Sequence, residues 1–359
     1  MMNRNLISLI RFPTAVRSTF LKAQTNRRTP TIQKRGFRYL IMDIQDYLFG
    51  RNIKKLRYLI PNRILRNIQE NVIYKPIIKQ RNYKYGAPTQ IFKAIFLELR
   101  SRCNSTCSFC PVSIGNDIRD DITMDFKLYK NIVNQLKEIN YGGRINFYNN
   151  SEPLITKNLF EYLEYATKTI KNDNNFRVMT NGISLNKSKS ENLVKSGINS
   201  IIVNLYLDDL TKDFPEKVMY LKELVDANNI EKNTKISLKI YKRLITEVLC
   251  NKSGDAPNKH EAYPMYFRGF CIQPFTRLVI DPNGVIGLCC MDAFIKKSFG
   301  NLNDSKLIDI WEGSELNHYR NELLQGNRSK LDVCSNCDYY GCGSSFNSMF
   351  KKFVYEITQ

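Results

Sequence analysis

The stretch that decides the fold is Glu98-Leu-Arg-Ser-Arg-Cys103-Asn-Ser-Thr-Cys107-Ser-Phe109-Cys110-Pro111. Its three cysteines have the spacing Cx3Cx2C and follow an apolar run, residues 94–99, that reads as a buried strand. Thiolates are soft ligands that suit iron–sulfur clusters and zinc. Three ligands are one short of the four that close a structural metal site, so one position is left for a substrate or cofactor. The count therefore favours a reactive centre over a structural one.

The motif resembles the signature of the radical S-adenosylmethionine (SAM) superfamily, Cx3CxΦC, in which an aromatic residue precedes the last cysteine. The resemblance implies that Cys103, Cys107 and Cys110 bind a [4Fe-4S] cluster, with Phe109 as the aromatic residue at the cofactor. It also implies that SAM binds the fourth iron and is reductively cleaved to a 5′-deoxyadenosyl radical, which abstracts hydrogen from a substrate. The implied partners are a small-molecule substrate and an electron donor such as flavodoxin or ferredoxin. The alternative is a zinc knuckle or a chance cluster of cysteines.

Two further segments match the superfamily pattern. Asn149-Asn-Ser151-Glu152-Pro153 stands where relatives carry Gly-Gly-Glu-Pro, which implies that Ser151 and Glu152 help to bind the SAM amino group. A carboxylate and turned backbone carbonyls suit an ammonium, which only donates hydrogen bonds. Asn204 occupies the place of a polar residue near the SAM ribose. The alternatives are a turn-capping surface acid for Glu152 and a backbone-bonded amide for Asn204.

Strands and helices are expected to alternate between residues 89 and 248, which indicates βαβ units and a parallel sheet. The periodicity predicts strands at 145–149, 176–180, 200–207 and 236–240, and helices at 126–139, 159–170, 185–194 and 218–227. The resemblance implies an α/β fold, a partial (β/α)6 TIM-like barrel. In either a barrel or an open sheet, the reactive site belongs at the carboxyl ends of the strands.

A second set of cysteines follows in the C-terminal third. Cys271 and Cys289 flank a predicted hairpin with an Asp-Pro-Asn-Gly turn, and Cys334-Ser-Asn-Cys337 adds an x2 pair, so four thiolates are available for a closed site. This part resembles the SPASM/twitch extension of radical SAM enzymes, and the resemblance implies one auxiliary [4Fe-4S] cluster on these four residues. Cys290 and Cys342 are alternative ligands, and a zinc ribbon is the alternative site.

Cys250 stands alone in the loop after the last core strand. A lone cysteine is usually a small buried apolar residue. In radical epimerases, however, a cysteine returns a hydrogen atom to the product radical, so Cys250 is a weak candidate hydrogen donor.

The basic charge of the chain is concentrated at its N-terminus. The formal net charge is +20, but residues 1–88 hold 19 Lys/Arg against 3 Asp/Glu, which leaves 35 against 31 in the remainder. The predicted catalytic body is nearly neutral, so no nucleic-acid partner is expected. Ten cysteines in 359 residues are too few for a secreted domain held together by disulfides. Their short spacings indicate metal binding instead, and we infer a reducing compartment.

Four segments follow from these patterns. Residues 1–42 are a basic tail or a transit peptide, and 43–88 are a basic helical extension that packs on its own domain or makes peripheral membrane contact. Residues 89–248 are the radical SAM core, and 249–359 are a small hairpin and helix domain for the auxiliary cluster. We expect a cytoplasmic protein, with the mitochondrial matrix as the alternative if residues 1–42 are a transit peptide.

The predicted function is hydrogen abstraction from a small sugar or aminocyclitol-like substrate, leading to oxidation or epimerisation. A single auxiliary cluster and the lack of an obvious peptide-recognition domain favour such a substrate. The alternatives are a radical SAM peptide maturase and a non-catalytic iron–sulfur or zinc-binding scaffold.

Overall fold

The structure is a computed structural model that describes residues 92–170, 176–231, 235–258, 271, 273–337 and 339. The predicted N-terminal segments, 1–42 and 43–88, lie outside the described residues, and so does Cys342. The tail, the helical extension and the cellular location therefore stay predictions. None of the helices in the described ranges has the length and hydrophobicity needed to cross a membrane.

The described residues form one eight-stranded sheet in the order β5-β4-β3-β2-β1-β6-β7-β8. The strands are β1 (Ala94–Leu97), β2 (Arg144–Asn146), β3 (Phe176–Thr180), β4 (Ser200–Leu207), β5 (Ser237–Leu244), β6 (Arg277–Ile280), β7 (Val285–Gly287) and β8 (Ser298–Asn301). From β5 to β6 every neighbouring pair is parallel, whereas β6, β7 and β8 are antiparallel. The predicted α/β class with a C-terminal hairpin domain is confirmed.

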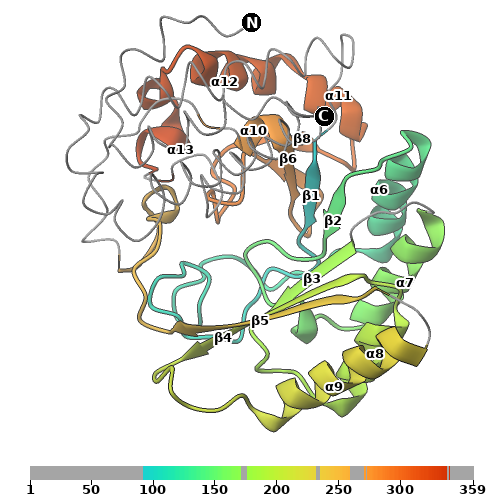
Figure 1. Ribbon diagram of the computed structural model, residues 1–359. Coiled ribbons are helices and arrows are strands. Elements are labelled where there is room, and N and C mark those ends of the chain that lie inside the picture. The colour runs from blue at the N-terminus through green and yellow to red at the C-terminus, as the bar shows by residue number, and fades with distance from the viewer. Residues whose placement is uncertain are drawn as a thin grey trace, which may run out of the picture. The chain divides into compact units, whose positions relative to one another are not determined.

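Four helices connect the first five strands. They are α6 (Phe126–Glu138), α7 (Leu159–Thr169), α8 (Lys187–Lys195) and α9 (Glu216–Glu231), and they lie along one side of β2 to β5 (Figure 1). Short strands linked by helices must run parallel, because the helix carries the chain back to the starting edge. The helix periods and the strands β3 and β4 agree with the sequence prediction, whereas β2 is shorter and β5 is longer than predicted.

The core lies between these helices and the sheet. Alternate strand residues such as Ile95, Ile145 and Val178 are fully buried against α6 and α7. Aromatic rings fill the space between the two helices: the hydroxyl of Tyr129 donates to the carbonyl of Tyr162 at 2.7 Å, and the two rings are 4.9 Å apart. Packing of this kind supplies most of the stability of such helices.

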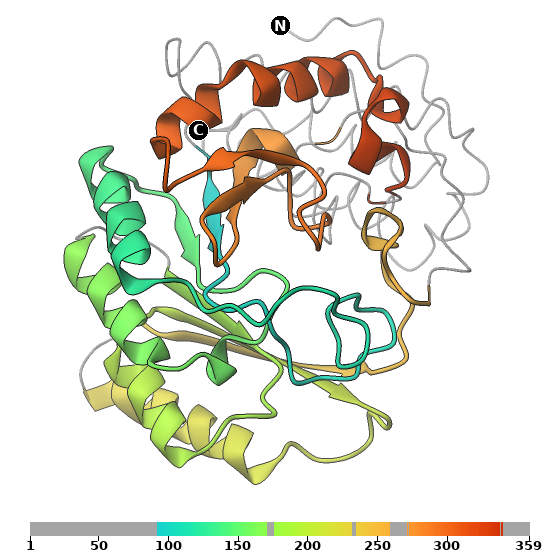
Figure 2. The same ribbon diagram turned by 180° about the vertical axis from the view of Figure 1, so that it is seen from behind.

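The C-terminal third adds its own strand to the parallel sheet. β6 pairs with β1 on the side away from β2, and α10 (Gln273–Thr276), α11 (Leu307–Glu312), α12 (Ser314–Leu324) and α13 (Asp332–Ser335) follow around it (Figure 2). The ring of Trp311 in α11 packs edge-on against Phe92, just before β1, with centroids 5.2 Å apart. The sixth parallel strand thus comes from the C-terminal third and lies next to β1.

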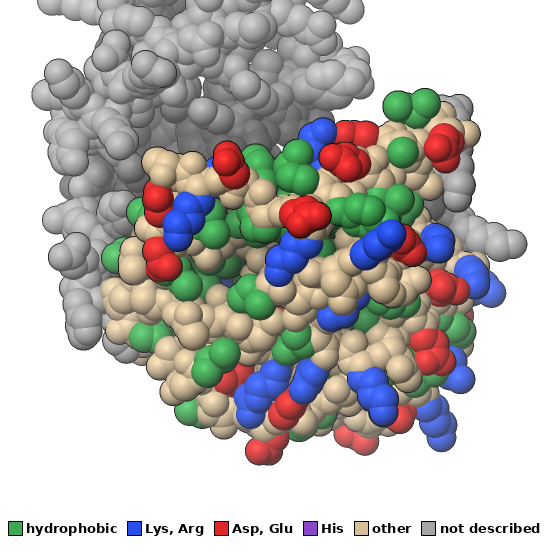
Figure 3. Space-filling model, turned by 90° about the horizontal axis from the view of Figure 1, so that it is seen from below, with side chains coloured by type: hydrophobic (Ala, Val, Ile, Leu, Met, Phe, Trp, Pro, Cys, Tyr) green, Lys and Arg blue, Asp and Glu red, His purple; other side chains and the backbone are tan. Residues whose placement is uncertain are grey.

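The turn of the predicted hairpin is built as expected. Gly284 has a φ of +84°, which favours glycine, and the carboxylate of Asp281 accepts hydrogen bonds from the amides of Asn283 and Val285 at 3.0 and 2.8 Å. Figure 3 shows basic and acidic side chains interspersed on one face of the described part. This agrees with the nearly neutral body inferred from composition.

Truncation of a core side chain provides a test of this packing. Leu163 on α7 has an exposed fraction of 0%, so Leu163→Ala should lower the free energy of unfolding by about 2–5 kcal/mol through lost apolar burial and a cavity. Leu210 is 43% exposed, so Leu210→Ala should change the free energy of unfolding by less than about 0.5 kcal/mol. Denaturant titration followed by circular dichroism measures both, and equal effects would contradict this assignment of the core.

Candidate active site

The first three cysteines lie in the loop that leaves the carboxyl end of β1. A turn closed by the Cys110 amide and the Cys107 carbonyl, at 3.1 Å, brings these two residues together. Cys107 is buried and its sulfur is 3.0 Å from the Ser105 hydroxyl, while the Asn181 amide lies 3.7 Å from the sulfur of Cys103. All three cysteines line one cavity.

The same cavity is lined from the ends of the other parallel strands. Residues 149–152 follow β2, Thr180 and Asn181 end β3, and Asn204 and Tyr206 lie on β4. The segment after β5 contributes residues 249, 250 and 252. The cavity therefore occupies the carboxyl edge of the sheet, where the sequence places the reactive site.

Phe109, Ser151, Glu152 and Asn204, the predicted SAM-binding residues, all lie in this lining. The ring of Phe109 is buried and lies 5.4 Å from the ring of Tyr206. Asn204 is 8% exposed and Ser151 is half-buried. The structure brings the predicted residues together, while their contacts with SAM stay predictions.

The carboxylate of Glu152 does cap a turn, η3 (Pro153–Ile155), as in the alternative interpretation, but it is buried and not at the surface, because its exposed fraction is 2%. It accepts hydrogen bonds from the Leu154 amide at 3.0 Å, the Thr180 hydroxyl at 2.6 Å and the Asn181 amide at 2.7 Å. Burial raises its pKa, and these bonds oppose that rise. Glu152 thus joins the segment after β2 to the end of β3.

The polar chemistry of the lining fits a bound cofactor. The side-chain nitrogen and oxygen of Asn149 are both buried with no hydrogen-bond partner among the described residues. Buried amides normally have partners, so this side chain is suited to a polar ligand.

The pKa of Cys103 is raised to about 12, chiefly by burial and further by the charges of Glu152 and the other two cysteines. Three desolvated thiols at one cavity fit a cationic iron cluster that would bind them as thiolates.

The second set of cysteines is gathered by the C-terminal domain. Cys271, Cys289, Cys334 and Cys337 are all buried in one apolar cluster with Leu288, Met291 and Leu323. Burial raises the pKa of Cys334 to about 12, and the neighbouring Cys271 and Cys337 also raise it. The predicted hairpin therefore does bring Cys271 and Cys289 to the same place as the x2 pair.

Cys290 packs against the edge of this cluster and is only partly buried. It is half-buried against Phe96 and Val279, and its sulfur accepts a hydrogen bond from the Arg277 guanidinium at 3.6 Å. Cys289 is buried inside the cluster with the other three cysteines, which favours it over Cys290 as the fourth ligand, and the assignment stays a prediction.

A buried cation lies beside the second set. The guanidinium of Arg328 is 2% exposed, donates to the Tyr339 carbonyl at 2.7 Å and forms no ion pair with a described acidic residue. Burial lowers its pKa, but the nearby Cys271, Cys337 and Cys334 raise it, with a net rise. Four thiolates around a metal cluster would supply the negative charge that this buried cation requires.

Across the described ranges, no three His, Cys, Asp or Glu side chains are spaced to hold a single metal ion.

Lys252, which the sequence analysis did not assign, connects the two sets of cysteines. The ammonium of Lys252, in η4 (Lys252–Gly254), donates to the Asn150 side chain at 3.0 Å and to the Cys290 carbonyl at 3.1 Å. Its backbone has a φ of +48°, a conformation that few non-glycine residues adopt. Lys252 is in the cavity lining, so a positive charge faces the ligand site between the two sets. The sequence signal that could have pointed to it is the segment Asn251-Lys252-Ser253-Gly254, whose glycine suits a tight turn.

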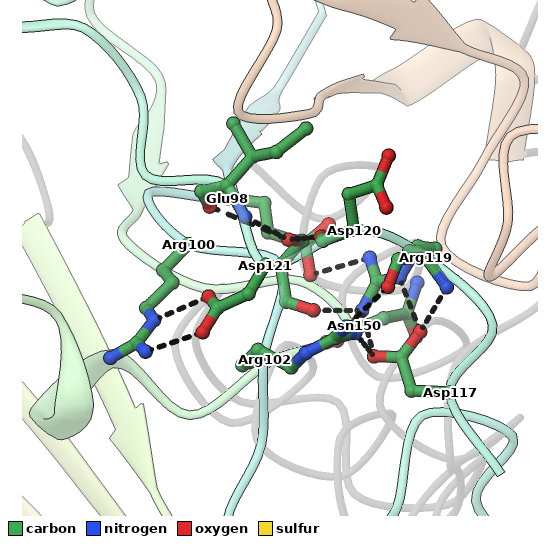
Figure 4. Close-up of polar contacts among 10 residues, drawn as sticks. Glu98, Arg100, Arg102, Asp117, Arg119, Asp120, Asp121 and Asn150 are labelled. Carbon is green, nitrogen blue, oxygen red and sulfur yellow. Dashed lines mark hydrogen bonds and ion pairs between the residues drawn. The ribbon is translucent and has the colours of Figure 1, made fainter.

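Arg119 organises a network of charges around the first loop (Figure 4). Its guanidinium pairs with Glu98 at 3.2 Å and with Asp117 at 3.0 Å, and it donates to the carbonyls of Ser101 and Asn150 at 2.9 Å. Glu98, at the end of β1, is completely buried, and burial raises its pKa while Arg119 lowers it. The network ties together β1, the cysteine loop and the segment after β2.

Comparisons with known families agree with this geometry. A model of the radical SAM superfamily matches residues 97–247, and a model of the SPASM iron–sulfur cluster-binding domain matches residues 271–338. The chain carries a radical SAM domain followed by a SPASM domain. The predicted family is thereby confirmed, and so are SAM and iron–sulfur clusters as its cofactors. The individual ligands stay predictions.

The chain is similar over most of its described part to one small-molecule enzyme. It is 29% identical over 259 residues to the S-adenosyl-L-methionine-dependent 2-deoxy-scyllo-inosamine dehydrogenase of Niallia circulans, a match covering 69% of this chain and 94% of the relative. The radical SAM domain together with a dehydrogenase relative supports an oxidoreductase.

Solved structures of BtrN show the same fold. The structure in complex with AdoMet and 2-DOIA superposes with a TM-score of 0.59 at 27% identity, covering 70% of this chain and 95% of BtrN. An open conformation of BtrN gives a TM-score of 0.52 at 25% identity, covering 70% and 94%.

Removal of Arg119 should destabilise the site. Arg119→Gln leaves the Glu98 carboxylate buried without its cation, which should cost about 3–5 kcal/mol in the free energy of unfolding. Glu98→Gln should lower the free energy of unfolding clearly less, because Arg119 then still has its ion pair with Asp117. Denaturant titration gives both values, and a smaller loss for Arg119→Gln than for Glu98→Gln would refute this role.

The two adjacent cysteines should behave differently. Cys289→Ala should lose the auxiliary cluster, reducing iron from about 8 to about 4 atoms per chain after anaerobic reconstitution, whereas Cys290→Ala should keep both clusters. Iron and sulfide analysis with electron paramagnetic resonance measures this. Loss of iron in Cys290→Ala alone would reverse the assignment, and bound zinc would favour the ribbon.

Proposed function

We propose that this chain is a SAM-dependent dehydrogenase that oxidises a small polyhydroxylated substrate of the aminocyclitol or sugar class. The observation that carries the proposal is the position of Lys252 and Asn150, which join the lining of the three-cysteine cavity to the loop that holds Cys289 and Cys290. One cysteine set in the cavity and a second set linked to it through Lys252 suit removal of a hydrogen atom from an alcohol carbon, followed by loss of one electron to the auxiliary cluster and of one proton. The relative named for dehydrogenation of 2-deoxy-scyllo-inosamine supports the reaction and the substrate class.

The first set would hold the SAM-binding cluster through Cys103, Cys107 and Cys110, and the second set would hold the auxiliary cluster through the four buried cysteines of the C-terminal domain. When bound, SAM with the first cluster supplies hydrogen-atom abstraction, and the auxiliary cluster supplies an acceptor for one electron. A single zinc ion at the second set would lack this capacity because it has no redox chemistry.

The chain's own residues position and enclose the reactants. The amide of Asn149 offers a donor and an acceptor that have no described protein partner, and Glu152 holds the segment that presents it. The rings of Phe109 and Tyr206 form an apolar wall that excludes water from the cavity. The ammonium of Lys252 offers a hydrogen-bond donor to substrate oxygen atoms.

Product analysis tests the proposal. The reconstituted enzyme, supplied with SAM, dithionite and 2-deoxy-scyllo-inosamine without oxygen, should form 5′-deoxyadenosine together with a ketone that has lost two hydrogen atoms. Cys107→Ala should abolish both products, because the first cluster needs all three thiolates. Deoxyadenosine formation that does not respond to any cyclitol or sugar would contradict the proposed substrate class.

Epimerisation is a second candidate, supported by Cys250. This residue lines the cavity and its thiol donates to the sulfur of Met291 at 3.2 Å, so a hydrogen source is present beside the ligand site. An epimerase would return a hydrogen atom and give a product of unchanged mass, which the same assay separates from a ketone. Loss of an isomerised product in Cys250→Ala would favour this candidate, whereas a ketone formed at the wild-type rate would favour the dehydrogenase.

An external electron donor such as flavodoxin or ferredoxin completes the proposal, since the first cluster must be reduced before SAM is cleaved. Contact with a membrane through residues 43–88 and a matrix or cytoplasmic location are further proposals on residues outside the described ranges.

A further inference from the structure

Three arginines lie together on one face of the sheet. Arg144 on β2 and Arg277 on β6 both pair in register with Ala94 on the strand between them, and Arg177 on β3 pairs with Asn146. Residues paired in register, or two apart along a strand, point to the same face. This is the face opposite the helix-covered core, and the strand between Arg144 and Arg277 carries the small side chain of Ala94 at this register position.

The three positive charges have no negative partner among the described residues. Arg177 donates to the Ser200 hydroxyl at 3.0 Å, and Arg277 donates to the Cys290 sulfur and lies 5.6 Å from the Phe96 ring centre. No ion pair with a described acid involves Arg144, Arg177 or Arg277. Burial lowers the pKa of Arg144, and the charges of Arg177 and Arg277 lower it further. Burial also lowers the pKa of Arg277, but Cys290 raises it, with a net rise. The repulsion among the three cations therefore falls mainly on Arg144, which is exposed and where an anion would relieve it.

Tyr148 connects this cluster to the candidate active site. It lines the cavity, lies on the same face as Arg144 and packs edge-on against Phe96 with centroids 5.7 Å apart. Burial raises its pKa, and the charges of Arg177, Arg144 and Arg277 all oppose that rise, so the three arginines act directly on a residue of the cavity.

We propose that Arg144, Arg177 and Arg277 bind a phosphate group carried by the substrate. Arginine presents planar N–H donors that match phosphate oxygens, and three of them around one point suit a dianion. The inference rests on the proposed function and narrows its substrate to a phosphorylated cyclitol or sugar.

Calorimetric titration of the reconstituted enzyme with SAM bound tests this with three probes: myo-inositol 1-phosphate, myo-inositol and inorganic phosphate. The ester should bind at least tenfold more tightly than either of the others, and its affinity should fall with salt because the contacts are ionic. In Arg144→Gln/Arg177→Gln the affinity for the ester should fall at least thirtyfold, while that for myo-inositol should change less than twofold. Arg177→Lys, which keeps the charge, should retain most of the affinity for the ester.

Lys168→Gln is the matched control, since Lys168 is an exposed cation on α7, 76% accessible, and its loss should leave binding of the ester unchanged. Iron content and melting temperature check that each variant is folded. Equal binding of ester and myo-inositol, or an undiminished affinity for the ester in the double variant, would overturn the inference. Equal binding of ester and inorganic phosphate would overturn it as well, because it indicates an adventitious anion site only.

Failure of the proposed function gives a different result. Without SAM cleavage the dehydrogenase proposal fails, while the titration, which needs no turnover, still decides the anion site. Oxidation of a neutral cyclitol without preference for the ester would support the dehydrogenase and refute the phosphate site.

Discussion

The ion pair between Arg119 and Glu98 is the interaction on which the candidate site depends. Glu98 is a carboxylate at the end of a fully buried strand, and a charge in that place is tolerated only with a partner. Arg119 supplies the partner, and its remaining N–H groups hold the carbonyls of Ser101 and Asn150. One guanidinium therefore fixes the start of the cysteine loop relative to the segment that follows β2. A loop that presents three thiols to one metal cluster requires this rigidity.

The second constraint is the close approach of the two cysteine sets. Asn150 links the Arg119 network to this second constraint. Its backbone carbonyl accepts a hydrogen bond from Arg119, and its side chain accepts one from Lys252, which also donates to the Cys290 carbonyl. Lys252, which is partly buried, places positive charge near Cys110 of the first set and Cys289 of the second, and the buried Arg328 does so beside the second set. Clusters bound by cysteine thiolates carry net negative charge, so these cations stabilise the bound form and influence the reduction potential.

The C-terminal domain contributes to the ligand face as well as to metal binding. Because β6 pairs with β1, it extends the parallel sheet and places Arg277 beside the arginines of β2 and β3. It also brings Cys290 and its neighbours over Phe96 and Val279. The face proposed to receive substrate is thus made by strands of both domains.

The sequence by itself determined the elements whose causes are local. The Cx3Cx2C and CxxC spacings, the helix periods, the apolar strands and the Asp-Pro-Asn-Gly turn all predict their structures, because neighbouring residues decide them. The alternation of strands and helices predicted a parallel sheet. A parallel sheet places Phe109, Ser151, Glu152 and Asn204 at its carboxyl edge, and the structure has all four in one cavity there.

Only the tertiary structure decided which distant residues meet. Two adjacent cysteines look alike in the sequence, and only the fold shows that Cys289 is buried with the other three while Cys290 is partly exposed. The pairing of β6 with β1, the contacts of Lys252 and Arg119, and the gathering of Arg144, Arg177 and Arg277 join residues from 20 to more than 100 positions apart, for example Lys252 with Asn150. No local pattern encodes such contacts, since they arise from strand register and from the need of buried charges for partners.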